Sequence, residues 1–429
     1  MTHRFKQWIV SGLVVAVAVC ASADEPEELE ESAGSQQSQK KSKSGYEEPP
    51  AIGGGPSVGG QLIDDDAVKL PLFPFNLLHD NFYKMKKSLK SKSGIEFNID
   101  YNFLNQYASF STDDRRGASG ALRFYGRWYP LWAKGPGKGS LVFRFENRHQ
   151  TGPQTPKELG LATGSSLTTA SFKEFGWGTT ALYWAQKTDD GRLAFVAGQM
   201  DPGDFEDIFP LLTAWTAFTN NASFNNPTTA LPNQGLGVVG RAFVSDHIYL
   251  KAGLNDANGE PTKIDFNSFF DVQEYFTWGE VGWAPDPDRE SAGESVHLLV
   301  WHSDERVEAE VPEGWGLAFS ASQEFGDTWI PYIRAGYSEG DAATLSAMVS
   351  LGVGWRVRDD DLVGAAVTWA RPPQGEKGRD QYTVEAFYRL QLTHNVQLTP
   401  GFHWHLKPSY NPLKNSVWVA AVVRFRFVL

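Results

Sequence analysis

The residues with the clearest chemical potential are arginines placed at even spacing in stretches where polar and apolar residues alternate. They are Arg123, Arg127, Arg144 and Arg148, with Arg241 in a later stretch of the same kind. Even spacing in an extended chain puts side chains on one face. A guanidinium group offers several donors in a fixed fork, which suits hydroxyl and carboxylate oxygens. A row of bare cations would instead select anions.

Carboxylates accompany these arginines at Glu96, Asp100 and Glu146. They could neutralise the arginines and orient their donors toward a ligand. The alternative is that the arginines are solvated side chains that only form mutual ion pairs. The sequence leaves both interpretations open.

A second group of candidate residues lies in the 34-residue stretch 201–234, which is rich in Asn, Thr, Pro and aromatic residues. Its acids are Asp201, Asp204, Glu206 and Asp207, and its aromatics include Trp215, Phe218 and Phe224. Aromatic faces stack on flat ligand rings while polar groups take the hydroxyls. The acids could equally pair with the arginines and pin the stretch. They lack the spacing of a calcium-binding loop, so we expect no metal site.

Enzymatic chemistry has weak support. His403 and His405 share one strand face, but a zinc site would need a third ligand, and none is evident. No G-x-S-x-G motif occurs. The glycine pattern at 235–240 matches G-x-G-x-x-G but falls in a predicted strand with no helix after it. We therefore expect no catalytic residues and no cofactor.

The chain begins like a secreted protein. Basic residues at 1–6 precede an apolar run at 8–19 and a small-residue cleavage site, which predicts a signal peptide over 1–23, cleaved after Ala23. The single cysteine, Cys20, lies within it, so the mature chain would contain none. A lipoprotein modified at Cys20 is the alternative, which the bulky Val19 disfavours. The net charge of -12 argues against nucleic-acid binding.

Three regions follow the signal peptide. Residues 24–69 are acidic, then Ser/Gln/Lys-rich, then Gly/Pro-rich, and predict a disordered linker. Apolar residues at helical spacing over 70–93 predict one short amphipathic helix that stops near Gly94. Residues 94–429 then alternate with period two and predict strands.

Turn signals divide 94–429 into sixteen predicted strands. They span 95–108, 118–130, 140–149, 176–187, 192–200, 235–244, 247–255, 273–284, 293–303, 314–325, 328–338, 344–356, 362–371, 380–392, 395–407 and 415–428. Tight turns alternate with longer polar loops around this even number of strands. That pattern is typical of an all-β, antiparallel transmembrane barrel in the outer membrane, whereas a soluble sandwich has no reason to sort its loops by length.

Aromatic residues at strand ends could form the two interfacial girdles of such a barrel. The candidates are Trp128, Tyr129, Trp132, Trp283, Trp329 and Tyr332. By strand parity, residues 201–234 join the fifth and sixth strands and form the third long loop.

Several segments resemble a known family. The runs AGQMDPGDFEDIF (197–209) and FNNPTTALPNQGLGVVGRAFVSDHIYLKAGLNDANG (224–259), with LTPGFHWHLKPSYNP (398–412), are similar to the carbohydrate-selective porins of the OprB family. The resemblance covers roughly 70–429. It implies a sixteen-stranded barrel in the outer membrane of a Gram-negative bacterium, narrowed by inward-folded loops, with an arginine-rich wall that guides sugars.

We therefore expect passive, substrate-biased diffusion of mono- or oligosaccharides. The alternatives are a general or anion-selective porin and, from another class, an outer-membrane barrel hydrolase. Expected partners are the sugar substrate, outer-membrane lipid and lipopolysaccharide. A homotrimer is common among sixteen-stranded porins, although no trimer contact is recognisable in the sequence.

Overall fold

The computed structural model describes residues 53–67, 69–78, 80–130, 139–166, 169–326, 328–358, 360–373 and 377–429. The chain divides into units 1–43 and 44–429, and all described residues belong to the second unit. The predicted signal peptide lies outside the described residues. Among those described, no helix is long and apolar enough to cross a bilayer.

The described chain forms one antiparallel sheet that closes on itself, because the first strand pairs with both the second and the last. The strands are β1 (Ile95–Ala108), β2 (Arg116–Trp128), β3 (Gly139–Gln150), β4 (Gly176–Lys187), β5 (Leu193–Met200), β6 (Gly235–Phe243), β7 (Ile248–Asp256), β8 (Tyr275–Trp283), β9 (Ser295–Ser303), β10 (Gly314–Ser322), β11 (Trp329–Glu339), β12 (Ala347–Arg358), β13 (Asp361–Arg371), β14 (Gln381–Gln391), β15 (Val396–Leu398), β16 (Gly401–Leu406) and β17 (Ser416–Val428). Both β15 and β16 pair with β14 and β17, so they occupy one position. The barrel therefore has sixteen strand positions, and the predicted fold class is confirmed.

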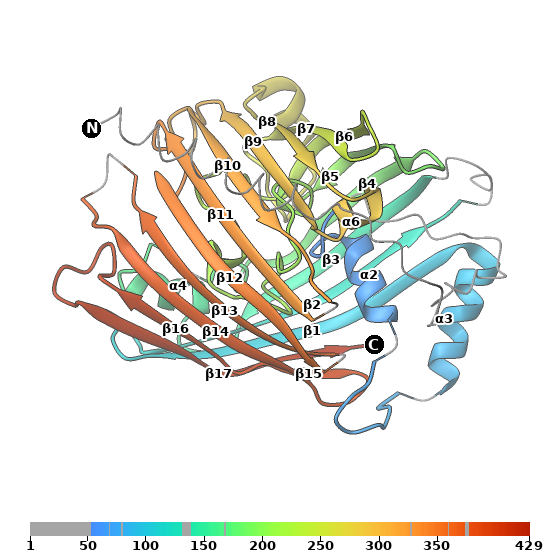
Figure 1. Ribbon diagram of the computed structural model, residues 1–429, viewed down its shortest axis with the longest axis horizontal. Helices are drawn as coiled ribbons and strands as arrows, with labels where there is room; N and C mark the ends of the chain where they lie inside the picture. The colour runs from blue at the N-terminus through green and yellow to red at the C-terminus, as the bar shows by residue number, and fades with distance from the viewer. Residues whose placement is uncertain are drawn as a thin grey trace, which may run out of the picture. The chain divides into compact units, whose positions relative to one another are not determined.

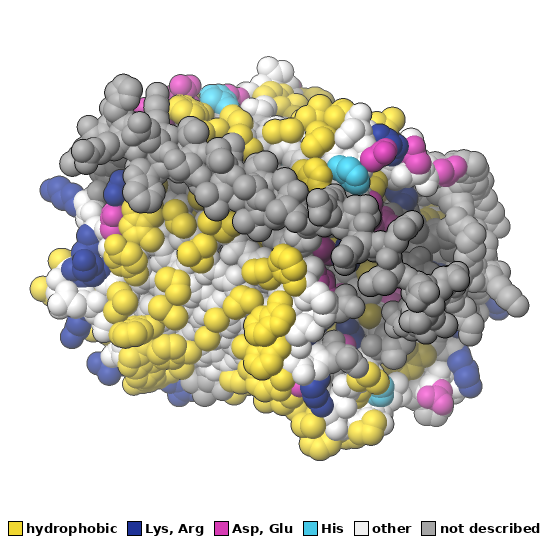
Figure 2. All heavy atoms as spheres, in the orientation of Figure 1, with side chains coloured by type: hydrophobic (Ala, Val, Ile, Leu, Met, Phe, Trp, Pro, Cys, Tyr) yellow, Lys and Arg dark blue, Asp and Glu magenta, His cyan; other side chains and the backbone are white. Residues whose placement is uncertain are grey.

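Burial follows the alternation of the sequence. In β1 and β3 most polar side chains are buried inside the barrel and most apolar ones lie on the outer face; Leu104 and Val142 are buried exceptions. Arg144 is 3% exposed, for example, whereas its neighbour Phe145 is 37% exposed. Figure 2 shows hydrophobic side chains gathered over the outer face of β11–β14, where Leu351 and Val367 are each 52% exposed. This inverted pattern is the one expected of a barrel surrounded by lipid.

Most of the short connections lie at one end of the barrel, although the longer connection 284–294 lies there too. The short ones, 188–192, 244–247, 323–328, 359–360 and 392–395, define what we call the short-turn end. The opposite, long-loop end carries 151–175, 201–234 and 257–274, among others. Figure 1 shows α3 (Asp80–Ser93) and the C-terminus at one end of the barrel and α4 (Pro156–Ala162) at the other.

Short helices occupy the connections. The α4 helix starts with a capping box in which Thr155 and Glu158 satisfy each other's backbone amides. Further short helices are η1 (Pro202–Asp204), α5 (Asn221–Phe224), η2 (Ser268–Val272) and α6 (Pro287–Ser291).

The described part of the predicted linker differs from the expectation of disorder. Residues Val58–Asp66 form helix α2, in which Val58 and Leu62 are fully buried. Helix α3 begins later than the predicted 70–93 helix, at Asp80. The residues 70–78 run as an irregular segment along the short-turn end, where Leu72 bonds to the backbone of Gln391.

The predicted girdle residues do not all face lipid. Trp283 and Trp329 lie at strand ends on the outer face, and Trp329 stacks on Trp355 with ring centroids 5.3 Å apart. Tyr129 and Tyr332 are buried, at 2% and 5% exposure. Sequence spacing misassigned these two, because Tyr129 follows the end of β2 and Tyr332 is on the inward row of β11. Trp132 lies outside the described residues.

Candidate functional site

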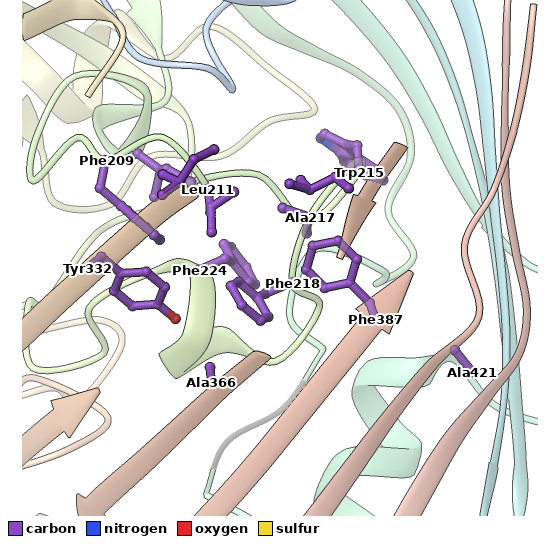
Figure 3. Packing of buried hydrophobic residues seen from close by; sticks show 14 of the residues in the cluster. Phe209, Leu211, Trp215, Ala217, Phe218, Phe224, Tyr332, Ala366, Phe387 and Ala421 are labelled. Carbon is purple, nitrogen blue, oxygen red and sulfur yellow. The ribbon is translucent and has the colours of Figure 1, made fainter. Parts of the chain in front are cut away.

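The connection 201–234 folds into the barrel, and we call it the constriction loop. It starts at β5 and returns to β6, yet its apolar side chains pack on strands across the lumen. Figure 3 shows Phe209 and Phe218 of the loop against Tyr332 of β11 and Phe387 of β14. The Phe209–Tyr332 centroids are 4.9 Å apart and the Phe218–Phe387 centroids 5.0 Å apart. The loop thus bridges the lumen through an apolar cluster.

Polar contacts hold the same loop at several points on the opposite wall. The Thr219 amide donates to Glu385 of β14 at 2.7 Å, and the Thr219 hydroxyl lies 2.8 Å from His403 Nε2. Arg424 of β17 donates to the carbonyl of Ala217 at 2.6 Å. Each buried loop amide or carbonyl must find a partner in the absence of bulk water, and these inward side chains supply it.

A second anchor lies nearer the start of the loop. Asp207 forms an ion pair with Arg334 of β11, and His297 Nε2 of β9 lies 2.9 Å from Asp207 Oδ1. Asp207 and Arg334 are both fully buried. The sequence left open that the acids of this loop pair with the predicted arginines. Asp207 does pair with basic residues, but these are Arg334 and His297.

A hollow of about 250 Å³ remains on the long-loop side of the constriction loop, and we call it the outer hollow. Its lining includes Arg144, Glu146, Arg148, Lys173, Asp201, Asp204, Trp215, Phe224, Asn233 and Gln234. Strand β3 and the constriction loop thus supply charged groups, amides and two aromatic rings to one cavity.

Two of the predicted arginines reach this hollow. Arg148 pairs with Glu146 at 2.6 Å, and its guanidinium lies 5.1 Å from the ring centroid of Trp215. Arg144 lies 3.1 Å from Glu146 and 3.4 Å from Asp204 of the loop. The outer hollow thus brings two of the predicted arginines, a predicted carboxylate and loop residues together, with both arginines in ion pairs.

The other predicted arginines are buried elsewhere in the lumen. Arg123 pairs with Asp100 at 2.8 Å and stacks on Trp215, with its guanidinium 4.4 Å from the ring centroid. Arg127 pairs with Glu96 at 2.7 Å.

Arg241 pairs with Glu290 of α6 and donates to the Gly191 carbonyl at 3.0 Å, in the short turn after β4. It is therefore separate from the outer hollow. Glu206 of the loop is 1% exposed, and Phe218 is in the apolar cluster rather than in the hollow.

Sequence reasoning missed several inward cations. Arg424 and Arg426 lie in the final strand at even spacing, so the alternation of polar and apolar residues that predicted this strand could have identified them. Lys173, which donates to Asn233 at 2.7 Å, sits in a loop without periodicity and gave no signal.

A closed antiparallel barrel with a lipid-facing apolar surface, a polar lumen and a loop folded across that lumen defines a porin. The family comparison gives the same class and makes it specific. The model of the carbohydrate-selective porin family OprB matches residues 135–429, and this chain belongs to that family. It is an outer-membrane channel for carbohydrate diffusion.

Solved structures share the fold at low sequence identity. A high-pH structure of Pseudomonas putida OprB superposes with a TM-score of 0.61 at 12% identity, covering 81% of this chain and 97% of that one. A low-pH structure of the same protein has a TM-score of 0.48 at 12% identity, covering 83% and 99%. A mutant porin of Rh. blastica has a TM-score of 0.48 at 12% identity, covering 78% and 100%. No curated protein sequence matches the chain.

Proposed function

We propose that the outer hollow is the site at which this porin contacts sugar during passive diffusion. The observation that carries the proposal is the convergence of Arg144, Arg148 and Glu146 with Trp215 and Phe224 around one cavity. Arginine and carboxylate groups hydrogen-bond hydroxyls, and aromatic faces accept the apolar face of a sugar ring. No chemical step is required, because conduction needs only weak and multiple contacts.

The size of the hollow favours one ring at a time. Pockets for drug-sized ligands hold roughly 300–1,000 Å³. The outer hollow, at about 250 Å³, is below that range. An oligosaccharide would therefore pass ring by ring, each ring replacing the preceding one at the same contacts.

Charge balance favours neutral sugars over anions. Arg123, Arg127 and Arg148 each face a carboxylate within hydrogen-bond distance, at 2.8, 2.7 and 2.6 Å respectively. A ring of uncompensated cations is what selects anions. Positive and negative side chains alternate on the wall, so its donors and acceptors suit polyhydroxylated solutes. The anion-selective alternative therefore has less support.

The test is sugar block of ion current through the purified protein in planar bilayers. We expect Arg148→Ala to raise the maltose or glucose concentration for half-block about tenfold, because a hydrogen bond to a charged group contributes roughly 1.5 kcal/mol. Arg144→Ala combined with Arg148→Ala should weaken the block further. Arg148→Lys should retain part of it, since lysine keeps the charge but loses the fork.

Arg192→Ala is the matched control, because Arg192 is an exposed arginine in the short turn and pairs with Asp246 at 2.9 Å. Its block should equal that of the unmodified protein. Unchanged block in the Arg144/Arg148 double variant would exclude the outer hollow as the sugar site.

Processing and assembly remain predictions. We propose cleavage after Ala23, which N-terminal sequencing of protein from outer membranes would test. We also propose that the apolar face contacts membrane lipid and lipopolysaccharide, and that the barrel assembles as a homotrimer. The mass of the detergent-solubilised protein by light scattering separates a monomer from a trimer.

A further inference from the structure

The segment from Gly53 to Asp66 lies inside the barrel. Helix α2 presents Val58, Leu62 and Asp65 at helical spacing to the wall. Val58 and Leu62 are 0% and 1% exposed and share a buried cluster with Tyr125, Val142 and Tyr183 of the wall. The helix is therefore docked on β2, β3 and β4 through its apolar face.

Asp65 fixes the other end of the helix to the barrel. Both Asp65 oxygens accept from Arg426 of β17, at 2.7 and 2.9 Å, and Asp65 also bonds to Tyr125 of β2. Its side chain is only 2% exposed. A buried bidentate arginine–carboxylate pair is directional, so it sets the orientation of α2 in the lumen.

The start of the segment packs on the constriction loop. The Gly54 amide donates to the Asp204 carbonyl at 2.8 Å, and a Cβ at Gly54 would lie 2.6 Å from Cγ2 of Ile208. A Cβ at Gly53 would lie 2.6 Å from the Asp204 carbonyl oxygen, so glycine is required there for the approach of the two backbones. Arg144 joins the two elements, because it donates to the Pro56 carbonyl at 3.0 Å and pairs with Asp204.

The segment also separates two hollows. Pro56 lines the outer hollow, whereas Asp65 and Asp66 line an inner hollow of about 540 Å³ at the short-turn end. The face of α2 that points away from the wall stays open, since Ile63 is 47% exposed. A segment with this placement narrows the passage between the hollows without filling it.

We propose that residues 53–66 form an internal plug that, together with the constriction loop, sets the upper size of solute the channel admits. The inference rests on the proposed function, because the passage it narrows is the one that leads sugar away from the outer hollow. The plug and the constriction loop together narrow the channel, and release of α2 from the wall would widen the route between the two hollows.

The test compares variants of the full chain in planar bilayers by single-channel conductance and by exclusion of uncharged polyethylene glycols of graded size. Val58→Asp combined with Leu62→Asp should release α2, because both carboxylates would replace apolar packing on the wall. We expect conductance to rise at least twofold and larger polymers to enter. Asp65→Asn leaves Arg426 paired with Asp100 at 2.7 Å. This variant should also raise the conductance and admit larger polymers.

Asp64→Asn is the matched control, because the Asp64 side chain is 47% exposed on the open side of α2. It should leave the polymer cut-off unchanged. Heat-modifiable migration in gels reports whether each barrel is folded, and Gly54→Val serves as an independent release variant if the double variant does not fold. An unchanged polymer cut-off in folded release variants would overturn the proposal.

Polymer exclusion does not depend on sugar recognition, so the two proposals fail separately. Loss of sugar block in Arg148→Ala with an unchanged cut-off in the release variants supports the sugar site and overturns the plug. The converse result supports the plug and overturns the sugar site.

Discussion

At the scale of single residues, Asp204 combines burial with a position on the channel. It is 3% exposed and lines the outer hollow from η1 of the constriction loop. Burial, against the opposing effect of Arg144 and with smaller contributions from Asp201 and Glu146, raises the pKa of Asp204 to about 7. Its charge therefore changes near neutral pH.

We predict that the channel becomes more cation-preferring as pH rises through about 7, because Asp204 then becomes negative. Rising pH also lowers the folding stability. The Asp204 carboxyl loses its proton near pH 4 in the unfolded chain, so its contribution to folding stability declines between about pH 4 and 7. Reversal potentials in a salt gradient, measured across this range, check the charge change.

Asp204→Asn should abolish that pH dependence, whereas Asp265→Asn, in an exposed loop, should retain it. An identical pH response in Asp204→Asn and the unmodified protein would assign the titration to another group.

At the scale of elements, the constriction loop depends on a few buried pairs. Arg334 of β11 is fully buried and pairs with Asp207 of the loop. Its Nε also donates to Ser320 at 3.0 Å, but Asp207 is its charged partner. Removing one member of a buried pair leaves an uncompensated charge.

Asp207→Ala should therefore destabilise the docked loop by about 3–5 kcal/mol. The measurement is limited proteolysis of the folded protein, in which cleavage within 201–234 should accelerate, together with increased open-channel noise. Asp265→Ala provides the comparison, because Asp265 pairs with an exposed Lys263 at 2.8 Å and such pairs contribute little. A loop equally resistant in both variants would show that the remaining contacts hold it without the Asp207–Arg334 pair.

At the scale of the whole molecule, the lipid-facing surface limits which substitutions the barrel tolerates. Phe143 lies on the outer face of β3, beside Phe124 and Phe145, with centroids 5.4 and 6.1 Å away. Phe143→Arg should reduce the free energy of unfolding by roughly 2–4 kcal/mol if Phe143 lies near the middle of the membrane, because it places a charge against hydrocarbon. Urea titration of the barrel in lipid vesicles measures this change.

Thr277→Arg is the comparison, since Thr277 is near the end of β8 and the cost of arginine falls to about 0–1 kcal/mol at the interface. Equal stability of Phe143→Arg and the unmodified barrel would contradict the outward assignment of Phe143.

Most of the barrel was predictable from sequence because its signal is local. Alternation in β1 and β4 gave the same bounds as the structure, 95–108 and 176–187. The break between β15 and β16 did not appear in the pattern. It falls at Thr399 and Pro400, where proline has no amide to donate to a neighbouring strand.

The site was less predictable because its contacts are long-range. The arginine row could be placed inside by parity, and its carboxylate neighbours Glu96, Asp100 and Glu146 could be named. The contacts with the loop could not, since Arg144 meets Asp204 and Arg334 meets Asp207 only once the loop has folded into the barrel. Helix α2 gave no signal for the same reason. It has few apolar residues of its own, and the wall on which Val58 packs is built from strands more than 60 residues further along the chain.

The position of Arg426 has a consequence for the order of assembly. Its Nε bonds to Asp100 of β1 at 2.7 Å, across the seam where the last strand meets the first, and its two other nitrogens hold Asp65. The Arg426 contacts of Asp65 therefore join α2 to the seam itself, so the polar part of its docking site is complete only when β17 has paired with β1.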